Sequence, residues 1–366
     1  MKKVSIVIVV LLMLAIPLVS AQEDGLPDLI LAANPGMHPE GIEWDSEGER
    51  FLVGSITQGT IFAVDDEGNV QPFVEDDNLM ASIGIHIDHA NGVLLVANSD
   101  FAVTSDQNAT GVAQLGAYDL ETGEQIYFAD MTGLTEGRNF TNDVTSDTEG
   151  NAYVTNSFAP VIYKVDPEGN AEIFIENEQL GAQGFGLNGI DFHPHEYLLA
   201  AVAGTQSLFK IPLDDPESLT QVELSEPLGI DGMVLNDEGH LVTVATNSEG
   251  VRRVYELSSD DEWATAMVVA SGDAMPDAAP TTVALRDGSA YVVHAHFGEI
   301  GADEPVQEFE IMRVELVSED MDDEMGEEMD DDSDDDMADD EMGDDDTDDG
   351  DDDDAPDAEA TEEVSG

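Results

Sequence analysis

A short motif that recurs six times is the feature that most constrains the fold of this 366-residue chain. In each copy a first residue is followed by glycine or another small or turn-forming residue, then by alternating apolar residues and further strand-like runs. Successive copies begin 43, 59, 46, 43 and 51 residues apart, close to the roughly 40 to 50 residues of a four-stranded propeller blade. The copies begin at Glu40, Ile83, Asn142, Asn188, Asp231 and Thr282. The repeat therefore predicts an all-β fold, a six-bladed β-propeller.

The pattern inside each copy separates this fold from other repeat architectures. Apolar residues alternate with period two, and acidic turns that end in glycine, such as Asp66-Glu67-Gly68 and Asp237-Glu238-Gly239, divide the strands. No stretch between residues 27 and 316 keeps a 3.6-residue apolar stripe, which excludes a helical solenoid, and a β-sandwich would not repeat one motif six times. We expect Leu29 to Ala33 to pair with the last strands, near Ile311 to Leu316, and to close the ring.

The N-terminus predicts export from the cytoplasm. Lys2 and Lys3 precede an apolar run, and Val19-Ser20-Ala21 offers a small-residue cleavage site. We interpret residues 1–21 as a cleaved secretory signal peptide, which makes the mature protein secreted or extracytoplasmic. The alternative is an uncleaved anchor, although the apolar run is shorter than the roughly 20 residues that span a membrane. No other segment approaches that length, so no membrane span is expected after cleavage.

The distribution of charge divides the rest of the chain into a folded domain and a tail. From residue 319 to the end there are 29 acidic residues and no basic one, so we expect residues 319–366 to be disordered and residues 22–318 to form the propeller. The formal net charge of −73 makes nucleic acid and anionic lipid poor partners. Because the chain has no cysteine, disulfides and thiolate metal sites are excluded. We expect a monomer with a small-molecule substrate.

The first residue of each copy carries the chemistry. Each blade of a propeller presents its innermost strand to the central channel, so equivalent residues form one ring around the axis. Glu40 and Asp231 would bring two carboxylates to that ring, and Asn142 and Asn188 would bring two carboxamides. Such hard oxygen ligands suit Ca²⁺ better than Zn²⁺ or Mg²⁺. The alternative is that Asn-Gly and Asp-Gly pairs only serve as turns at each blade entry.

Four segments, in the same order along the chain, resemble a known family of propellers. The chain is similar to the senescence-marker-protein, gluconolactonase and luciferin-regenerating-enzyme family, and especially to its calcium-dependent phosphotriesterase-like members. The resemblance covers the whole predicted domain and has no counterpart for the tail. It rests on His38-Pro39-Glu40-Gly41, on Asn142-Asp143-Val144 with Gly150 to Ser157, on Leu187-Asn188-Gly189-Ile190 and on Asp231-Gly232-Met233.

The resemblance implies a metal site and a hydrolytic activity. It implies that Glu40, Asn142, Asn188 and Asp231 bind a divalent metal, commonly Ca²⁺, which polarises a lactone carbonyl or a phosphoryl oxygen. It makes Asp231 the candidate base or nucleophile, and it places a histidine, best matched by His296, at the active site. His296 can equally be structural, and we interpret His86 as structural.

Two functions therefore remain open. The first is an exported Ca²⁺-dependent hydrolase of lactones or phosphoester-like compounds. The second is a non-catalytic, metal-stabilised propeller that binds a ligand or partner outside the cell, because propellers host many unrelated functions.

Overall fold

The structure is a computed structural model that describes residues 25–106 and 108–318. The chain divides into two units, residues 1–323 and 324–366, and the second unit lies wholly outside the described residues. The predicted signal peptide (1–21) and acidic tail (319–366) also lie outside them. Within the described part no helix is long and apolar enough to cross a membrane.

Apart from short 3-10 helices, the regular secondary structure of the described residues is β-strand, which confirms the predicted all-β class. Three sheets each contain four consecutive antiparallel strands. They are β2 (Pro39–Asp45), β3 (Arg50–Ser55), β4 (Thr60–Val64) and β5 (Val70–Glu75); β6 (Ala81–Asp88), β7 (Val93–Ser99), β8 (Gln114–Asp119) and β9 (Gln125–Asp130); and β10 (Thr141–Ser146), β11 (Ala152–Asn156), β12 (Val161–Val165) and β13 (Ala171–Glu176).

Two further runs of four strands are joined into one nine-stranded sheet. The runs are β14 (Leu187–His193), β15 (Tyr197–Val202), β16 (Ser207–Pro212) and β17 (Thr220–Leu224), then β18 (Leu228–Leu235), β19 (Leu241–Asn247), β20 (Arg252–Ser258) and β21 (Thr265–Gly272). The parallel pair β17–β21 joins them, and β25 (Val317–Ser318) pairs with β21.

The first strand of the described residues completes the sheet formed by β22 (Pro280–Arg286), β23 (Ser289–His294) and β24 (Glu308–Val314). This strand, β1 (Leu29–Ala33), pairs antiparallel with β24. Leu29 lies opposite Met312 and Ala33 opposite Glu308. The predicted pairing of Leu29 to Ala33 with a strand near Ile311 is confirmed, with residues 308–312 as the partners. Closure protects the edges at which strands from another molecule could add.

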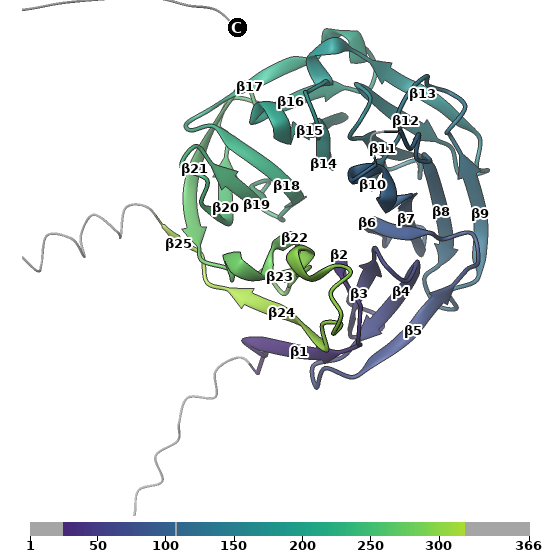
Figure 1. Cartoon of the computed structure of the whole chain (residues 1–366). Helices are drawn as coiled ribbons and strands as arrows, with labels where there is room; N and C mark the ends of the chain where they lie inside the picture. Colours follow the sequence, from purple (N-terminus) through teal and green to yellow (C-terminus); the bar gives the residue numbers. More distant parts are fainter. Residues whose placement is uncertain (1–24, 107, 319–366) are drawn as a thin grey trace, which may run out of the picture. The chain divides into compact units, whose positions relative to one another are not determined.

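The four-stranded units surround a common centre, in a propeller-like arrangement (Figure 1). The strands β2, β6, β10, β14, β18 and β22 lie innermost, and β5, β9, β13, β17, β21 and β1 lie at the rim. Apolar clusters fill the space between neighbouring sheets; one contains Ile30, Phe51, Tyr291 and Phe309, each at most 1% exposed. Each such side chain stabilises the fold by roughly 1.5–3 kcal/mol.

Short 3-10 helices occupy the connections. They are η1 (Phe101–Thr104), η2 (Glu178–Leu180), η3 (Ala203–Thr205), η4 (Pro216–Ser218), η5 (Pro276–Ala278) and η6 (Phe297–Glu299). The acidic turns connect the first strand of a unit to the second, or the third to the fourth, and follow one design. In the turn between β4 and β5, Asp65 accepts hydrogen bonds from the backbone N–H groups of Glu67 and Asn69, and Gly68 adopts φ +79°. The turn therefore combines an aspartate with a left-handed glycine, and Asn236 takes the aspartate position in the turn that contains Gly239.

Every innermost strand contains a β-bulge at its repeat position, where two residues lie opposite one on the neighbouring strand. The first bulge residues are Glu40, Ile83, Asn142, Asn188, Asp231 and Thr281. The sixth member of the ring is thus Thr281, and the assignment to Thr282 is wrong by one residue. The sixth copy has two threonines in its bulge and no glycine, so the pattern alone could not set its register.

The second bulge residue is glycine in four units because each bulge packs closely against the next innermost strand. A Cβ atom on Gly41 would lie 2.5 Å from the carbonyl oxygen of Ile83, and one on Gly189 would lie 2.2 Å from that of Asp231. The other two units carry Asp143 and Thr282 there, and these side chains occupy space left by Gly84 and Gly232. The glycines of the repeat therefore hold the six bulges in contact with one another.

Candidate metal and active site

The four predicted ligands lie at the same position in four bulges, at the beginning of β2, β10, β14 and β18. All four are buried, with exposures of 7% for Glu40, 3% for Asn142, 8% for Asn188 and 8% for Asp231. Burial of so many polar groups is costly unless each has a partner. Their partners therefore reveal what the site can do.

Asn188 and Asp231 are in direct contact. The Nδ2 atom of Asn188 donates a hydrogen bond to Oδ1 of Asp231 at 2.8 Å. The donor side of the carboxamide is thereby used, which leaves Oδ1 of Asn188 available as a ligand atom. The structure thus brings together two predicted ligands that are 43 residues apart in sequence.

Asn142 is oriented by a neighbouring serine. Its Nδ2 atom donates to Oγ of Ser157 at 2.9 Å, and that hydroxyl donates to the carbonyl oxygen of Leu187 at 2.7 Å. Because Nδ2 of Asn142 is used as the donor, as in Asn188, its Oδ1 atom is available to accept a hydrogen bond or to bind a metal ion. Ser157 follows β11 directly, so the second strand of the unit sets the orientation of a side chain on the first.

Glu40 belongs to the same electrostatic environment as Asp231. Burial raises the pKa of Glu40 well above its usual value, and the negative charges of Asp231 and Asp143 raise it further, whereas Arg252 lowers it. Within the described residues no hydrogen bond or ion pair reaches the Glu40 carboxylate. A buried carboxylate without a partner, beside a second carboxylate, either takes up a proton or needs a cation nearby.

Arg252 supplies part of the missing positive charge. It begins β20, and its guanidinium forms an ion pair with Oδ2 of Asp231, so both oxygens of that carboxylate have protein partners. Nε of Arg252 is buried and has no hydrogen-bond partner among the described residues. One arginine cannot neutralise Glu40 and Asp231 together. The residues therefore fit a divalent cation that binds oxygen, and such a cation would compete with Arg252 for Asp231.

The histidine of the His-Pro-Glu-Gly segment connects the beginning of β2 to the last sheet. His38 is 3% exposed, and its Nδ1 atom lies 2.9 Å from the carbonyl oxygen of Ala295, just after β23. Oγ1 of Thr281 donates to the carbonyl oxygen of Glu40 at 2.8 Å. Two contacts across the closure of the ring therefore position the backbone that carries Glu40.

His296 lies between two carboxylates of its own unit, one on β24 and one on η6. It precedes η6 in the left-handed conformation, with φ +51°. Its Nε2 atom lies 2.6 Å from Oε2 of Glu310, and Nδ1 lies 3.5 Å from Oε1 of Glu299. Within residues 25–106 and 108–318 it makes no hydrogen bond or ion pair with the four predicted ligands. Its catalytic role stays a prediction.

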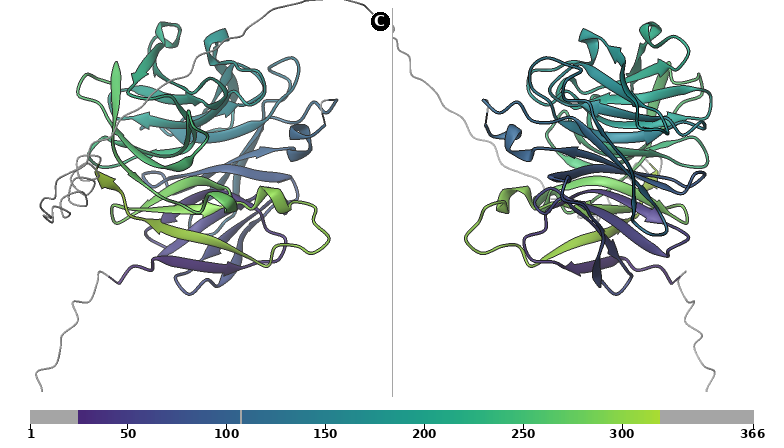
Figure 2. Two further views of the ribbon diagram at one scale, coloured as in Figure 1. Left: turned by 60° about the vertical axis from the view of Figure 1, so that its left-hand side comes forward. Right: turned by 90° about the vertical axis from the view of Figure 1, so that its right-hand side faces the viewer.

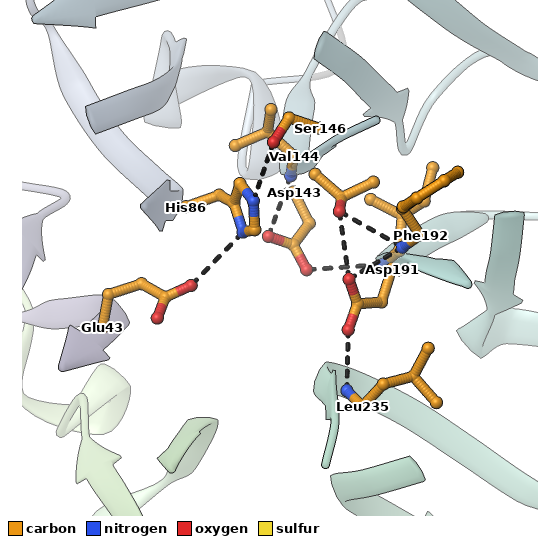
Figure 3. Close-up of polar contacts among 10 residues, drawn as sticks. Glu43, His86, Asp143, Val144, Ser146, Asp191, Phe192 and Leu235 are labelled. Carbon is orange, nitrogen blue, oxygen red and sulfur yellow. Dashed lines mark hydrogen bonds and ion pairs between the residues drawn. The ribbon is translucent and has the colours of Figure 1, made fainter. Parts of the chain in front are cut away.

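A second polar group lies farther along the same innermost strands. A cavity of about 1270 Å³ is lined there by Glu43, His86, Asp143 and Asp191, among others. His86 Nδ1 lies 3.5 Å from Glu43 Oε1, and its Nε2 lies 3.1 Å from Ser146 Oγ (Figure 3). This part of the channel contains the second halves of the strands, whereas the predicted ligands occupy their beginnings.

Burial dominates the titration of this second group. Burial raises the pKa of Asp143 to about 8. The hydrogen bonds that this carboxylate accepts from the N–H groups of Val144 and Ile190 have the opposite, smaller effect. Burial also raises the pKa of Asp191, which accepts hydrogen bonds from the N–H groups of Phe192 and Leu235 (Figure 3). For His86 burial lowers the pKa, but the hydrogen bond and charge of Glu43, with smaller effects of Asp191 and Asp143, raise it overall.

Comparison with known protein families identifies the fold. The family model described as SMP-30/Gluconolactonase/LRE-like region matches residues 38–271. The chain belongs to this family. The match includes all four predicted ligands and ends before His296, so the family assignment gives His296 less support than the other site residues.

Solved structures with the same fold are distant in sequence. The Malassezia sympodialis allergen Mala s 1 has a TM-score of 0.67 and 20% identity, with 79% of this chain and 96% of that chain covered. A gluconolactonase from Xanthomonas campestris has a TM-score of 0.51 and 12% identity, with 78% and 89% covered. The calcium-binding protein regucalcin from Agrobacterium tumefaciens has a TM-score of 0.51 and 18% identity, with 77% and 92% covered. Comparison with curated proteins found no match.

Sequence reasoning missed three polar residues of this SMP-30/gluconolactonase-like site. Arg252 could have been noticed from composition. The chain has only ten lysines and arginines against 83 acidic residues, so an acidic partner for this arginine was to be expected. Ser157 lies inside a quoted segment of the family resemblance but received no role. Asp143 also lies inside a quoted segment and received no role, whereas it occupies the glycine position of its bulge.

Proposed function

We propose that this family member is an exported, metal-dependent hydrolase of lactones or phosphoester-like small molecules, with Ca²⁺ as the metal. The observation that carries the proposal is the unpartnered, buried carboxylate of Glu40 close to the charge of Asp231, which itself accepts a hydrogen bond from Asn188. Glu40, Asn142, Asn188 and Asp231 would hold the cation through oxygen atoms. Bound Ca²⁺ supplies Lewis-acid polarisation of a carbonyl or phosphoryl oxygen.

The protein's own groups account for the remaining chemistry. Asp231 is the candidate base or nucleophile, because its carboxylate can orient a water molecule and accept a proton or attack the polarised centre. Asn188 fixes one oxygen of that carboxylate through its Nδ2 atom. Arg252, once released from the other oxygen, is a donor for the oxyanion that forms when the ester bond is attacked. His296, with Glu310 and Glu299 beside it, is a candidate proton carrier.

The wider organisation follows the sequence. We propose that the four-stranded units are the blades of a six-bladed propeller (22–318), preceded by a signal peptide (1–21) and followed by an acidic tail (319–366). The mature protein would be secreted or extracytoplasmic and monomeric. The net charge of −73 supports a small-molecule substrate over nucleic acid.

One observation favours the alternative of a non-catalytic, metal-stabilised binding propeller. Both oxygens of Asp231 already have protein partners, an arrangement that stabilises the fold without any substrate. In this alternative metal binding raises thermal stability but no lactone or phosphoester is turned over.

Hydrolysis of a panel of lactones and aryl phosphoesters, measured with and without a chelator, tests the proposal. We expect turnover of at least one compound, its loss when the chelator removes Ca²⁺, and its return when Ca²⁺ is added back. Turnover that is unchanged by the chelator would contradict a role of the metal in catalysis. No turnover of any compound, together with a chelator-dependent fall in melting temperature, would favour the binding propeller.

A further inference from the structure

Five phenylalanines lie on loops at the same end of the units as the predicted ligands. Each comes directly before an innermost strand or soon after a second strand, where the ligand-bearing bulges also lie. The helices η1 and η6, which begin with two of them, lie on the same side of the ring (Figure 2). We call these residues the aromatic wall; they are Phe101, Phe140, Phe158, Phe185 and Phe297.

The members of the wall form one continuous chain of ring contacts. Ring centroids are 5.0 Å apart for Phe158 and Phe185, 5.6 Å for Phe140 and Phe185, and 6.0 Å for Phe140 and Phe158. Phe101 connects Phe140 to Phe297, with 6.3 Å to each. The wall therefore spans loops from four different units, although no two of its members are neighbours in sequence.

Two contacts make the wall continuous with the ligand ring. Ile83, which holds the ring position of the second unit, is 1% exposed and packs in the same apolar cluster as Phe140. Ser157, which accepts the hydrogen bond from Asn142, directly precedes Phe158. The oxygen ligands therefore border an apolar surface on the side of the second and third units.

The wall is held in place but is not covered. Arg138 lies 4.0 Å from the centroid of Phe158 and donates to the carbonyl oxygen of Val103 next to the cluster. Phe185 is 38% exposed, and Phe101, Phe158 and Phe297 are partly exposed. Exposed, clustered aromatic rings beside a polar centre are typical of small-molecule sites, where a few polar groups orient a mostly apolar ligand.

We infer that the substrate of this site carries an alkyl or aryl group that packs on the aromatic wall, and that a polyhydroxylated sugar lactone is a poor substrate. The inference rests on the proposed hydrolase function and names its substrate class. The hydroxyl groups of a sugar lactone would lose water against phenyl rings that offer no hydrogen-bond partner, whereas an alkyl chain or ring gains from leaving water.

Direct binding and turnover of three probes test this inference. The probes are unsubstituted γ-butyrolactone, the same lactone carrying an octyl chain, and glucono-δ-lactone, each titrated by calorimetry into the full chain with Ca²⁺ present. We expect the octyl lactone to bind at least about tenfold more tightly than the other two, the scale of a filled apolar pocket. Phe185→Ala should remove most of that preference, and Phe185→Leu should keep part of it.

Phe73→Ala is the matched control, because Phe73 is a partly exposed phenylalanine on β5 at the rim. It should leave the preference intact. Equal or tighter binding of the sugar lactone, equal effects of Phe185→Ala and Phe73→Ala, or no binding of the octyl lactone would each overturn the inference. Sedimentation with phosphatidylcholine vesicles that requires Phe185, with lactone binding unchanged by Phe185→Ala, would also overturn it and assign the wall to a membrane surface.

Turnover of the same probes separates this inference from the proposed function. Tight, Phe185-dependent binding of the octyl lactone without hydrolysis would leave the wall assignment standing and contradict the hydrolase. Hydrolysis of the sugar lactone at a kcat/KM equal to that of the octyl lactone would support the hydrolase and contradict the wall assignment.

Discussion

The guanidinium of Arg252 forms an ion pair with the carboxylate of Asp231, the residue expected both to bind the metal and to take part in catalysis. The pair is largely buried, with side-chain exposures of 25% for Arg252 and 11% for Asp231. Arg252 therefore occupies, as a resident cation, an oxygen that a metal ion would use.

Replacement of Arg252 should strengthen metal binding. In the variant Arg252→Gln, the positive charge that competes with a metal ion for Asp231 is removed. Glu40 also loses the one group that lowers its pKa. We expect Ca²⁺ affinity, measured by calorimetry, to rise about tenfold, the scale of one charge interaction in a partly buried site. Arg253→Gln is the matched control, because Arg253 pairs with Asp273, which is 82% exposed. Weaker Ca²⁺ binding in Arg252→Gln would show that the arginine positions Asp231 for the metal.

The glycines of the bulges should tolerate no side chain. Gly189→Ala would place a Cβ atom 2.2 Å from the carbonyl oxygen of Asp231, so the bulges of β14 and β18 must separate. We expect a loss of about 1–3 kcal/mol in the free energy of unfolding, typical of overpacking, together with weaker Ca²⁺ binding. Gly133→Ala is the control, because nothing lies within 4 Å of its Cβ position. Equal stability of the two variants, from denaturant titrations, would contradict the close packing of the bulges.

The pair formed by His86 and Glu43 should make stability depend on pH. The pKa of His86 is raised from its ordinary 6.5, so the folded state holds the proton more tightly than the unfolded state. This contribution to stability is fully present below pH 6.5 and is lost as pH rises through the folded-state pKa. Glu43→Gln removes the facing charge on β2, whereas Asp143 on β10 and Asp191 on β14 remain.

We therefore expect Glu43→Gln to lower the pKa of His86 in an NMR titration of the imidazole signals. The difference in melting temperature between the unmodified chain and this variant should be larger near pH 6 than near pH 9. Glu262→Gln, which removes a carboxylate 60% exposed beside His195, should leave the His86 titration unchanged. A pKa of His86 that does not move in Glu43→Gln would contradict the contact.

Much of the ring could be predicted because the motif repeats along the chain. Recurrence of the motif identified five of the six bulges, and glycine marks four of them because close packing excludes a Cβ atom at Gly41, Gly84, Gly189 and Gly232. The sixth bulge consists of two threonines, which the pattern does not distinguish, so its register was assigned to Thr282 when Thr281 is the equivalent residue. A local sequence pattern locates a bulge best where a glycine marks the position that has no room for a Cβ atom.

Contacts between different strands or units could not be predicted in the same way. Arg252 reaches Asp231 from the third strand of the same unit, and no periodicity relates the two positions. The aromatic wall joins loops whose lengths and sequences differ between units, so its members share no motif. His296 was placed by resemblance alone, and its two carboxylate neighbours lie on β24 and η6, which the resemblance did not consider.

A comparison of Asp231→Asn with Glu40→Gln, at saturating Ca²⁺ and with a lactone that the unmodified chain hydrolyses, tests the central claim most directly. Asparagine keeps an oxygen ligand but can act neither as base nor as nucleophile, so Asp231→Asn should lose about a hundredfold or more in kcat even when the metal site is full. Glu40→Gln removes only a ligand charge, so excess Ca²⁺ should restore most of its activity. Equal losses in the two variants, both fully restored by Ca²⁺, would contradict the assignment of Asp231 as the catalytic carboxylate.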